Sequence, residues 1–197
     1  LSKNSAGKLE SHLTFGLQVM GSNDAALSAQ VINLGSKVSE DLGLREHYSL
    51  QLNYIGSVES RTIFLDDLKN FYFDKQRSLC EACVKLQEQE DYISLLRCSE
   101  EDCSILAQLA PQLKNYLLPQ DQEQFEQLQG YLEELQLDFH PNPSLFGSHN
   151  YQAYTVFEWW HNDKGAQNII IAGGSNDAII AKLGGEPANL IGLQGSA

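Results

Sequence analysis

The chain has 197 residues, 42% of them hydrophobic, which is enough to bury one core in a single domain, with or without a small insertion. Thirteen basic against 26 acidic residues give a net charge of -13, which repels polyphosphates and argues against direct nucleic-acid binding. No apolar run approaches the roughly 20 residues that span a bilayer, and the N-terminus lacks a secretory signal. A cytoplasmic protein without a membrane segment is the default expectation, and Leu1 in place of Met is consistent with a fragment or a processed form.

The first third of the chain has alternating helix and strand signals. Asp24 and Ser57 stand where each would cap a helix. Apolar residues at steps of three and four predict one stripe on the first helix, formed by Leu27, Val31, Leu34, Val38 and Leu42. The expected order is strand, helix, strand and helix, at residues 15–20, 24–42, 48–54 and 58–73.

Between residues 74 and 140 the chain becomes rich in Gln and Glu, contains every cysteine and shows no strand-like alternation. This composition predicts a helical insertion. Its last helix, at 119–137, would present one apolar face, formed by Phe125, Leu128, Leu132 and Leu135.

After Pro141 the strand signals return. Residues 151–160 and 167–172 are rich in β-forming residues and are joined by a turn, which predicts a hairpin, and Gly173-Gly174 is expected to end its second strand. A short helix follows at 177–183. The predicted organisation has three segments: the first part of a core, a cysteine-containing insertion and the second part of the core, at residues 1–73, 74–140 and 141–197.

Four cysteines fall within 24 positions. Two residues separate Cys80 from Cys83, and four separate Cys98 from Cys103, a spacing compatible with a structural zinc site. The alternative is four reduced thiols, some of them buried as small apolar residues. A catalytic cysteine is disfavoured, because the surroundings are acidic and no histidine is near in sequence.

Three stretches resemble the histidyl-tRNA synthetases. They are LGLREHYSLQLNYIGSVESR (42–61), LCEACVKLQEQEDYISLLRC (79–98), and TVFEW (155–159) followed by AGGSND (172–177) and LGG (183–185). The resemblance implies an α+β fold of the class II synthetase type, an antiparallel sheet backed by helices with a helical insertion. It also implies a reaction that activates histidine with ATP before transfer to tRNA.

The family's Arg-Gly-Leu-Asp-Tyr-Tyr motif, which binds histidine ahead of TVFE, is degenerate in this chain. The catalytic Arg falls on Gly147 and the Asp on Asn150, and only Tyr151 matches. In the family's Ala-Gly-Gly-Arg-Tyr-Asp, Ser175 and Asn176 replace the phosphate-contacting Arg and the Tyr.

A third departure lies near the N-terminus, where Gln18 occupies a strand whose Gln and Glu hold histidine in the family. A neutral amide opposite an ammonium gives a weaker hydrogen bond than a carboxylate does. No catalytic residue is therefore predicted. The remnants of the histidine and ATP site are Gln18, Tyr151, Gly173, Gly174 and Asp177.

The resemblance without the charged groups favours a non-catalytic domain that serves as a structural or regulatory protein-interaction module, in a homo- or hetero-oligomer. Aromatic residues on the hairpin would be candidates for contacts: Tyr154, Phe157, Trp159 and Trp160. One alternative is part of a diverged synthetase, or of a histidine-sensing regulatory subunit, that still binds histidine or ATP. A small zinc-dependent interaction module is another.

Overall fold

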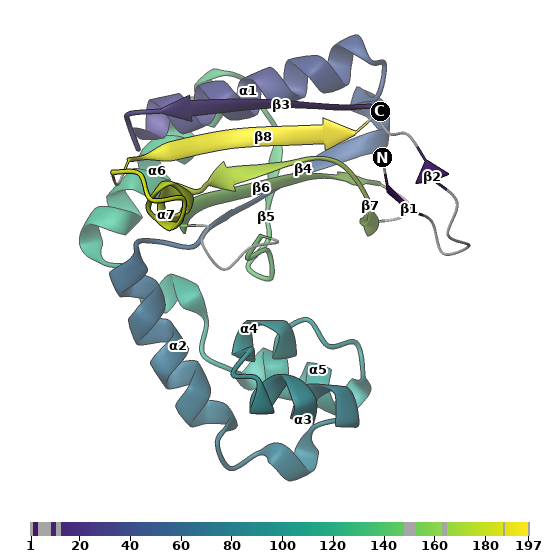
Figure 1. Ribbon diagram of the computed structural model, residues 1–197, viewed down its shortest axis with the longest axis vertical. Helices are drawn as coiled ribbons and strands as arrows, with labels where there is room; N and C mark the ends of the chain where they lie inside the picture. Colours follow the sequence, from purple (N-terminus) through teal and green to yellow (C-terminus); the bar gives the residue numbers. More distant parts are fainter. Residues whose placement is uncertain are drawn as a thin grey trace. The chain divides into compact units, whose positions relative to one another are not determined.

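The computed structural model describes residues 2–3, 9–10, 13–147, 153–162, 165–186 and 188–196. The chain forms two compact units: a sheet unit, made of Leu1–Tyr54 and Gln124–Ala197, and a helical unit, made of Ile55–Glu123. Figure 1 shows each of them. The helical insertion proposed from composition overlaps the second unit. Within the described ranges, no helix is long and apolar enough to cross a membrane.

The sheet unit is built on six strands in the order β3-β8-β7-β6-β4-β5. Every neighbouring pair is antiparallel except β4 and β5, which are parallel. A separate antiparallel pair is formed by β1 (Ser2–Lys3) and β2 (Leu9–Glu10). The six strands are β3 (Thr14–Met20), β4 (Tyr48–Tyr54), β5 (Phe139–Pro141), β6 (Ala153–His161), β7 (Gly165–Ser175) and β8 (Leu190–Ser196).

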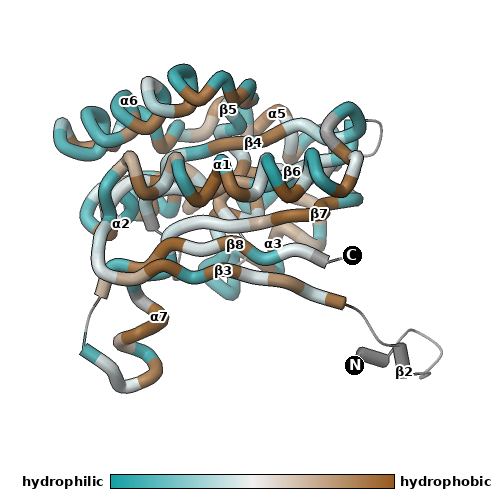
Figure 2. The backbone as a smooth tube through the Cα atoms, turned by 90° about the horizontal axis from the view of Figure 1, so that it is seen from above, coloured by the Kyte–Doolittle hydropathy of each residue, from teal (hydrophilic) through white to brown (hydrophobic). Residues whose placement is uncertain are grey.

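One face of this sheet carries the core, against helices α1 (Ala25–Asp41) and α6 (Pro119–Glu134). Figures 1 and 2 show α1 lying along the sheet. The helix begins after Asp24, whose carboxylate accepts the Ala26 N–H at 2.8 Å, as the sequence predicts. The sheet contributes buried apolar residues from four strands to this core, Leu50, Leu52, Phe157, Trp159, Ile171, Ile191 and Leu193, and residues of the two edge strands pack against it, Phe15, Leu17, Val19 and Phe139.

The apolar stripe predicted for α1 is only partly correct. Val31 is buried, but Leu34 and Leu42 are 42% and 53% exposed. Several small residues face the sheet together with Val31 and Ile32, because a helix that approaches a sheet closely has little room there for long side chains. The buried residues of α1 are Ala25, Ser28, Ala29, Val31, Ile32, Gly35 and Ser39. On α6, Leu128 and Leu132 are buried as predicted, whereas Leu135 is 41% exposed.

The other face of the sheet, which we call the polar face, is defined by Gln18, Gln194, Glu158, Gln51 and Asn53. Strand register places these side chains in two rows that run across the sheet. The rows are Gln18, Gly192, Gly174, Val156 and Asn53, and Gly16, Gln194, Ala172, Glu158, Gln51 and His140.

Three strand predictions differ from the structure. The segment predicted to be wholly helical ends in β5, which pairs with β4. Strand β8, which lies between β3 and β7, was not predicted from the sequence. Strand β7 continues through Gly173 and Gly174 to Ser175. A Cβ at Gly173 would meet the Phe157 ring and the Gly192 carbonyl, so this glycine permits close packing inside the sheet and does not end the strand.

The helical unit consists of short helices in sequence. After α2 (Val58–Tyr72) come η2 (Gln76–Ser78), α3 (Glu81–Glu88), α4 (Tyr92–Leu95), α5 (Glu101–Leu109), η3 (Leu113–Asn115) and the start of α6. Its fully buried side chains include Phe64, Leu68, Tyr72, Cys83, Leu95 and Cys103. Ser57 caps α2 by accepting the Ser60 N–H at 3.3 Å, as predicted. A short η1 (Arg45–His47) precedes β4 in the sheet unit.

Candidate functional site

The polar face is made mainly of neutral side chains, with one carboxylate and the imidazole of His140, the register partner of Gln51. None of the six described strands contains Lys or Arg. The carboxylate belongs to Glu158, which accepts a hydrogen bond from the indole N–H of Trp160 at 2.6 Å. The face can therefore offer amide, imidazole and carboxylate hydrogen bonds, but its described strands provide no ammonium or guanidinium group to a phosphate.

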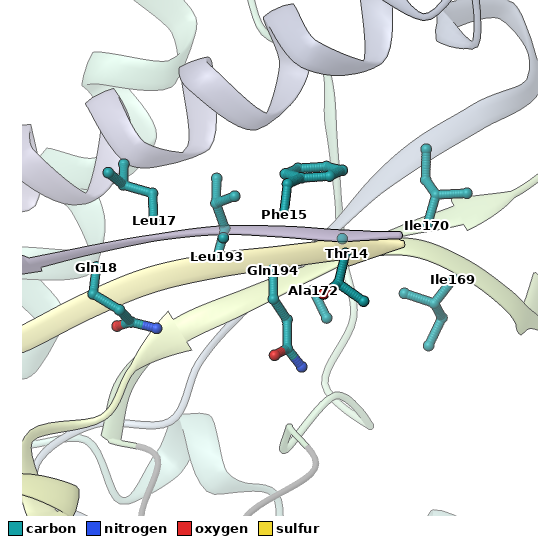
Figure 3. A pocket seen from close by; sticks show the side chains of 11 residues that line it. Thr14, Phe15, Leu17, Gln18, Ile169, Ile170, Ala172, Leu193 and Gln194 are labelled. Atoms are coloured by element: carbon teal, nitrogen blue, oxygen red, sulfur yellow. The ribbon is translucent and has the colours of Figure 1, made fainter. Parts of the chain in front are cut away.

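A cavity of about 490 Å³ opens along β3, β7 and β8. Figure 3 shows Gln18 and Gln194 projecting to one side of these strands, while Phe15, Leu17 and Leu193 project to the other side, toward the core. The two amides thus give the cavity polar atoms on the polar face. Its other lining residues are Thr14, Gly16, Ile169, Ile170, Ala172 and Gly195.

The structure brings together only some of the five predicted site remnants. Gln18 and Gly174 lie in one row of the polar face, on either side of Gly192. Gly173 belongs to the opposite face, where it packs against Phe157. Tyr151 lies outside the described residues.

Asp177 has a structural partner. Its Oδ1 accepts the backbone N–H of Leu190 at 2.7 Å, and this contact joins the start of α7 (Asp177–Lys182) to the start of β8. Burial raises the pKa of this carboxyl above its usual range, although the hydrogen bond from Leu190 opposes the shift.

Some of the positions where the family's motif residues are replaced have local roles. Gly147 has a φ of 71°, in the left-handed region that favours glycine. Ser175 is buried. Asn176 donates its side-chain amide to the Gly174 carbonyl at 3.3 Å and its backbone N–H to the Leu190 carbonyl at 2.7 Å. Asn150 lies outside the described residues.

The aromatic hairpin residues divide between two environments. Phe157 and Trp159 are 0% and 4% exposed and belong to the core, so they are not available to a partner. Tyr154 and Trp160 are half-buried. Alternation along the strand produces this division, as expected for side chains that point to opposite faces.

The four cysteines come together within the helical unit. Their Sγ atoms all lie within 4.8 Å of one another, and those of Cys80 and Cys98 are 3.8 Å apart. Cys83 and Cys103 are buried, while Cys80 and Cys98 are half-buried. A hydrogen bond with the backbone of Cys83 is the main cause that lowers the pKa of the Cys80 thiol to about 7, whereas burial raises the pKa of Cys83 and of Cys103.

The sequence of this chain is similar to those of known histidine-tRNA ligases. No family model matches the chain. Over 188 residues, which is 95% of this chain, it is 36% identical to a histidine-tRNA ligase of Dehalococcoides mccartyi and 32% identical to one of Halothermothrix orenii. The chain spans 44% of the length of each of these relatives.

Solved structures share the fold. The apo histidyl-tRNA synthetase of S. aureus aligns with a TM-score of 0.72 and 21% identity, over 93% of this chain and 44% of that one. A Bacillus halodurans protein named as an ATP phosphoribosyltransferase regulatory subunit/histidyl-tRNA synthetase aligns with a TM-score of 0.62 and 17% identity, over 93% and 51%. The ATP phosphoribosyl transferase (HisG:HisZ) complex of Thermotoga maritima aligns with a TM-score of 0.51 and 13% identity, over 94% and 66%. The predicted α+β fold with a helical insertion is confirmed.

Proposed function

We propose that this chain, which is homologous to the histidyl-tRNA synthetases and has their class II fold, is a non-catalytic synthetase-like domain. In this proposal it acts as a structural or regulatory protein-interaction module. The absence of Lys and Arg from the six described strands supports this proposal. Activation of histidine by ATP builds negative charge on the α-phosphate, and enzymes stabilise such charge with fixed cations or donors. A sheet surface whose described strands contain no Lys or Arg provides a poor environment for that transition state.

A protein partner is part of this proposal. Two of the structural relatives carry names of a regulatory subunit and of a complex with a second protein. A net charge of -13 would favour a partner with a basic surface over another acidic one. Light scattering of the purified chain tests for a homo-oligomer, and mixing it with a purified ATP phosphoribosyltransferase tests for a hetero-oligomer.

A second function, histidine sensing without catalysis, is supported by one specific observation. The cavity on the polar face has the amides of Gln18 and Gln194, and Glu158 lies in the same row as Gln194, one strand beyond Ala172. A carboxylate and neutral amides can hydrogen-bond an ammonium and an imidazole without any need for phosphate contacts. In this form the domain binds histidine and not ATP.

Calorimetric titration with histidine and with ATP separates these functions. The scaffolding function predicts no heat from either ligand, and the sensing function predicts micromolar binding of histidine alone. If histidine binds, Gln18→Ala should weaken it at least tenfold, whereas Gln112→Ala, an exposed amide of the helical unit, should leave it unchanged. Histidine-dependent exchange of pyrophosphate into ATP would show that both non-catalytic proposals are wrong.

A further inference from the structure

We propose that Cys80, Cys83, Cys98 and Cys103 bind one structural zinc ion that holds the helical unit together. The four thiols come from different places in that unit. Cys80 is the N-cap residue of α3 and Cys83 lies in its first turn, while Cys98 follows α4 and Cys103 lies in α5. A single ion would therefore connect three short helices.

The separations of the sulfur atoms suit a tetrahedral thiolate site. With zinc-sulfur bonds of about 2.3 Å, the edges of the tetrahedron measure about 3.8 Å. The Sγ atoms of Cys80 and Cys98 already lie 3.8 Å apart, and no pair in the cluster exceeds 4.8 Å. Side-chain rotations that shorten the longest of these separations by up to about 1 Å would complete the tetrahedron around an ion.

The local backbone also fits a zinc-binding turn. The backbone N–H of Cys80 donates to Sγ of Cys103 at 3.2 Å, so an amide dipole already points at a prospective ligand. The sulfur of Cys80 lies 3.8 Å from that of Cys98, so it is directed into the cluster. Amide donors of this kind stabilise thiolate charge.

The helical unit has a physical need for such a cross-link. Helices α3, α4 and α5 have 8, 4 and 9 residues. Helices shorter than about 12 residues are marginal by themselves, and small folds often use a metal to supplement a small core. Two of the four ligands, Cys83 and Cys103, are 1% exposed, so the ion would sit at the inner side of these helices.

Zinc accounts for the cluster better than disulfides do. A disulfide brings two sulfurs together and places no demand on a second pair, whereas here all four are mutually close. Binding releases one proton from each of the four thiols and forms four zinc-sulfur bonds, without any change of oxidation state. No oxidant or other reactant is required.

Metal analysis of the full chain, purified with a thiol reductant and without added chelator, tests the proposal. We expect about one zinc per chain by plasma mass spectrometry. After exchange for Co²⁺, the protein should show the intense thiolate charge-transfer and visible bands of tetrahedral cobalt, a readout that needs no variant to fold. Metal-free protein that gives no such bands with Co²⁺ would overturn the proposal, and so would two disulfides found by alkylation under non-reducing conditions.

Two half-buried ligands provide the least disruptive variants. Cys80→Ser and Cys98→Ser should each bind zinc at least tenfold more weakly, while Ser99→Ala, at the exposed position next to Cys98, should retain it. A chelator should lower the melting temperature of the wild type and of Ser99→Ala by more than that of a ligand variant. Equal zinc affinity of Cys98→Ser and the wild type, measured by competition with a chelator, would contradict the assignment. None of these results depends on whether histidine or ATP binds.

Discussion

The side chain of Gln18 lies directly over Gly192 on the polar face. A Cβ placed on Gly192 would overlap the Gln18 amide and the Leu17 carbonyl. The two residues are register partners in β3 and β8, and Figure 3 shows the Gln18 amide extending beside β8. The position of this amide therefore depends on the absence of a side chain in the neighbouring strand.

Gly192→Ala should destabilise the sheet unit by about 1–3 kcal/mol, because the new methyl group meets backbone that cannot move aside freely. Gly130→Ala is the matched control. Gly130 lies in α6 with open space around it, so alanine there should stabilise the helix by up to about 1 kcal/mol. Urea unfolding of the three proteins measures both effects. A Gly192→Ala protein as stable as wild type would show that β3 and β8 are not so closely paired.

Gly35 and Trp159 form a second close contact, between α1 and the sheet. A Cβ on Gly35 would lie 2.7–3.3 Å from three atoms of the indole ring. Gly35→Ala should therefore cost about 1–3 kcal/mol, even though alanine is the better helix former. In the Trp159→Phe background the smaller ring leaves room, so the same substitution should cost less. A double-mutant cycle of unfolding free energies measures this coupling, and strictly additive effects would argue against the contact.

The Gly35 contact also shows where sequence reasoning reaches its limit. Periodicity located α1 and its cap at Asp24 correctly. It placed the buried stripe on the longest apolar residues, but the side that meets the sheet combines Val31 and Ile32 with several small residues, and Leu34 is 42% exposed. Hydrophobicity reports which residues prefer burial. How closely a helix and a sheet approach depends on the residues of both. The sequence of the helix alone does not show which strand residues will pack against it.

In the strands and in the candidate site, too, some features could be predicted from the sequence and others could not. The hairpin of β6 and β7 was predictable from composition, whereas β8 was not, because glycines at 192 and 195 interrupt its apolar residues. Gly192 and Gly195 leave room for the side chains of Gln18 and Phe15 on β3, which is distant in sequence. The cysteine spacing indicated a metal-binding set, but only the fold brings the four sulfurs within 4.8 Å.

A buried carboxylate organises the start of α2. Asp121 is 2% exposed, and its Oδ2 accepts hydrogen bonds from the Ser60 hydroxyl at 2.5 Å, the Ser57 hydroxyl at 2.9 Å and the Ser57 N–H at 3.1 Å. Asp121→Ala would leave the buried Ser60 hydroxyl without its acceptor, at a cost of about 1–3 kcal/mol, and would remove the acceptor of the half-buried Ser57 donors, at a smaller cost.

Asp121→Asn keeps one carbonyl oxygen and should lose less than Asp121→Ala does. Asp66→Ala, an exposed acid of α2, should change the unfolding free energy by less than about 0.5 kcal/mol. Circular dichroism during urea unfolding measures the three variants. If Asp121→Ala behaved like Asp66→Ala, the network around Ser57 and Ser60 would contribute nothing to stability.

Asp177 should make the stability of the chain depend on pH in the opposite direction to an ion-paired carboxylate. Burial raises the pKa of Asp177 in the folded state. As pH rises from about 3, Asp177 ionises first in the unfolded chain, where its pKa has the usual value of about 4. Ionisation therefore stabilises the unfolded state before it stabilises the folded state. Stability contributed by this group is therefore present at low pH and lost as pH rises through the folded pKa.

Asp177→Asn removes that ionisation but keeps an oxygen that can accept the Leu190 N–H. Relative to wild type, its unfolding free energy should increase between about pH 3 and pH 7, since only the wild type loses stability through this group over that range. Asp177→Ala lacks the acceptor and should be less stable than Asp177→Asn at both pH values. Urea unfolding at a series of pH values measures all three proteins. A difference between Asp177→Asn and wild type that stays constant or falls with pH would mean that the hydrogen bond from Leu190, and not burial, dominates the environment of this carboxyl.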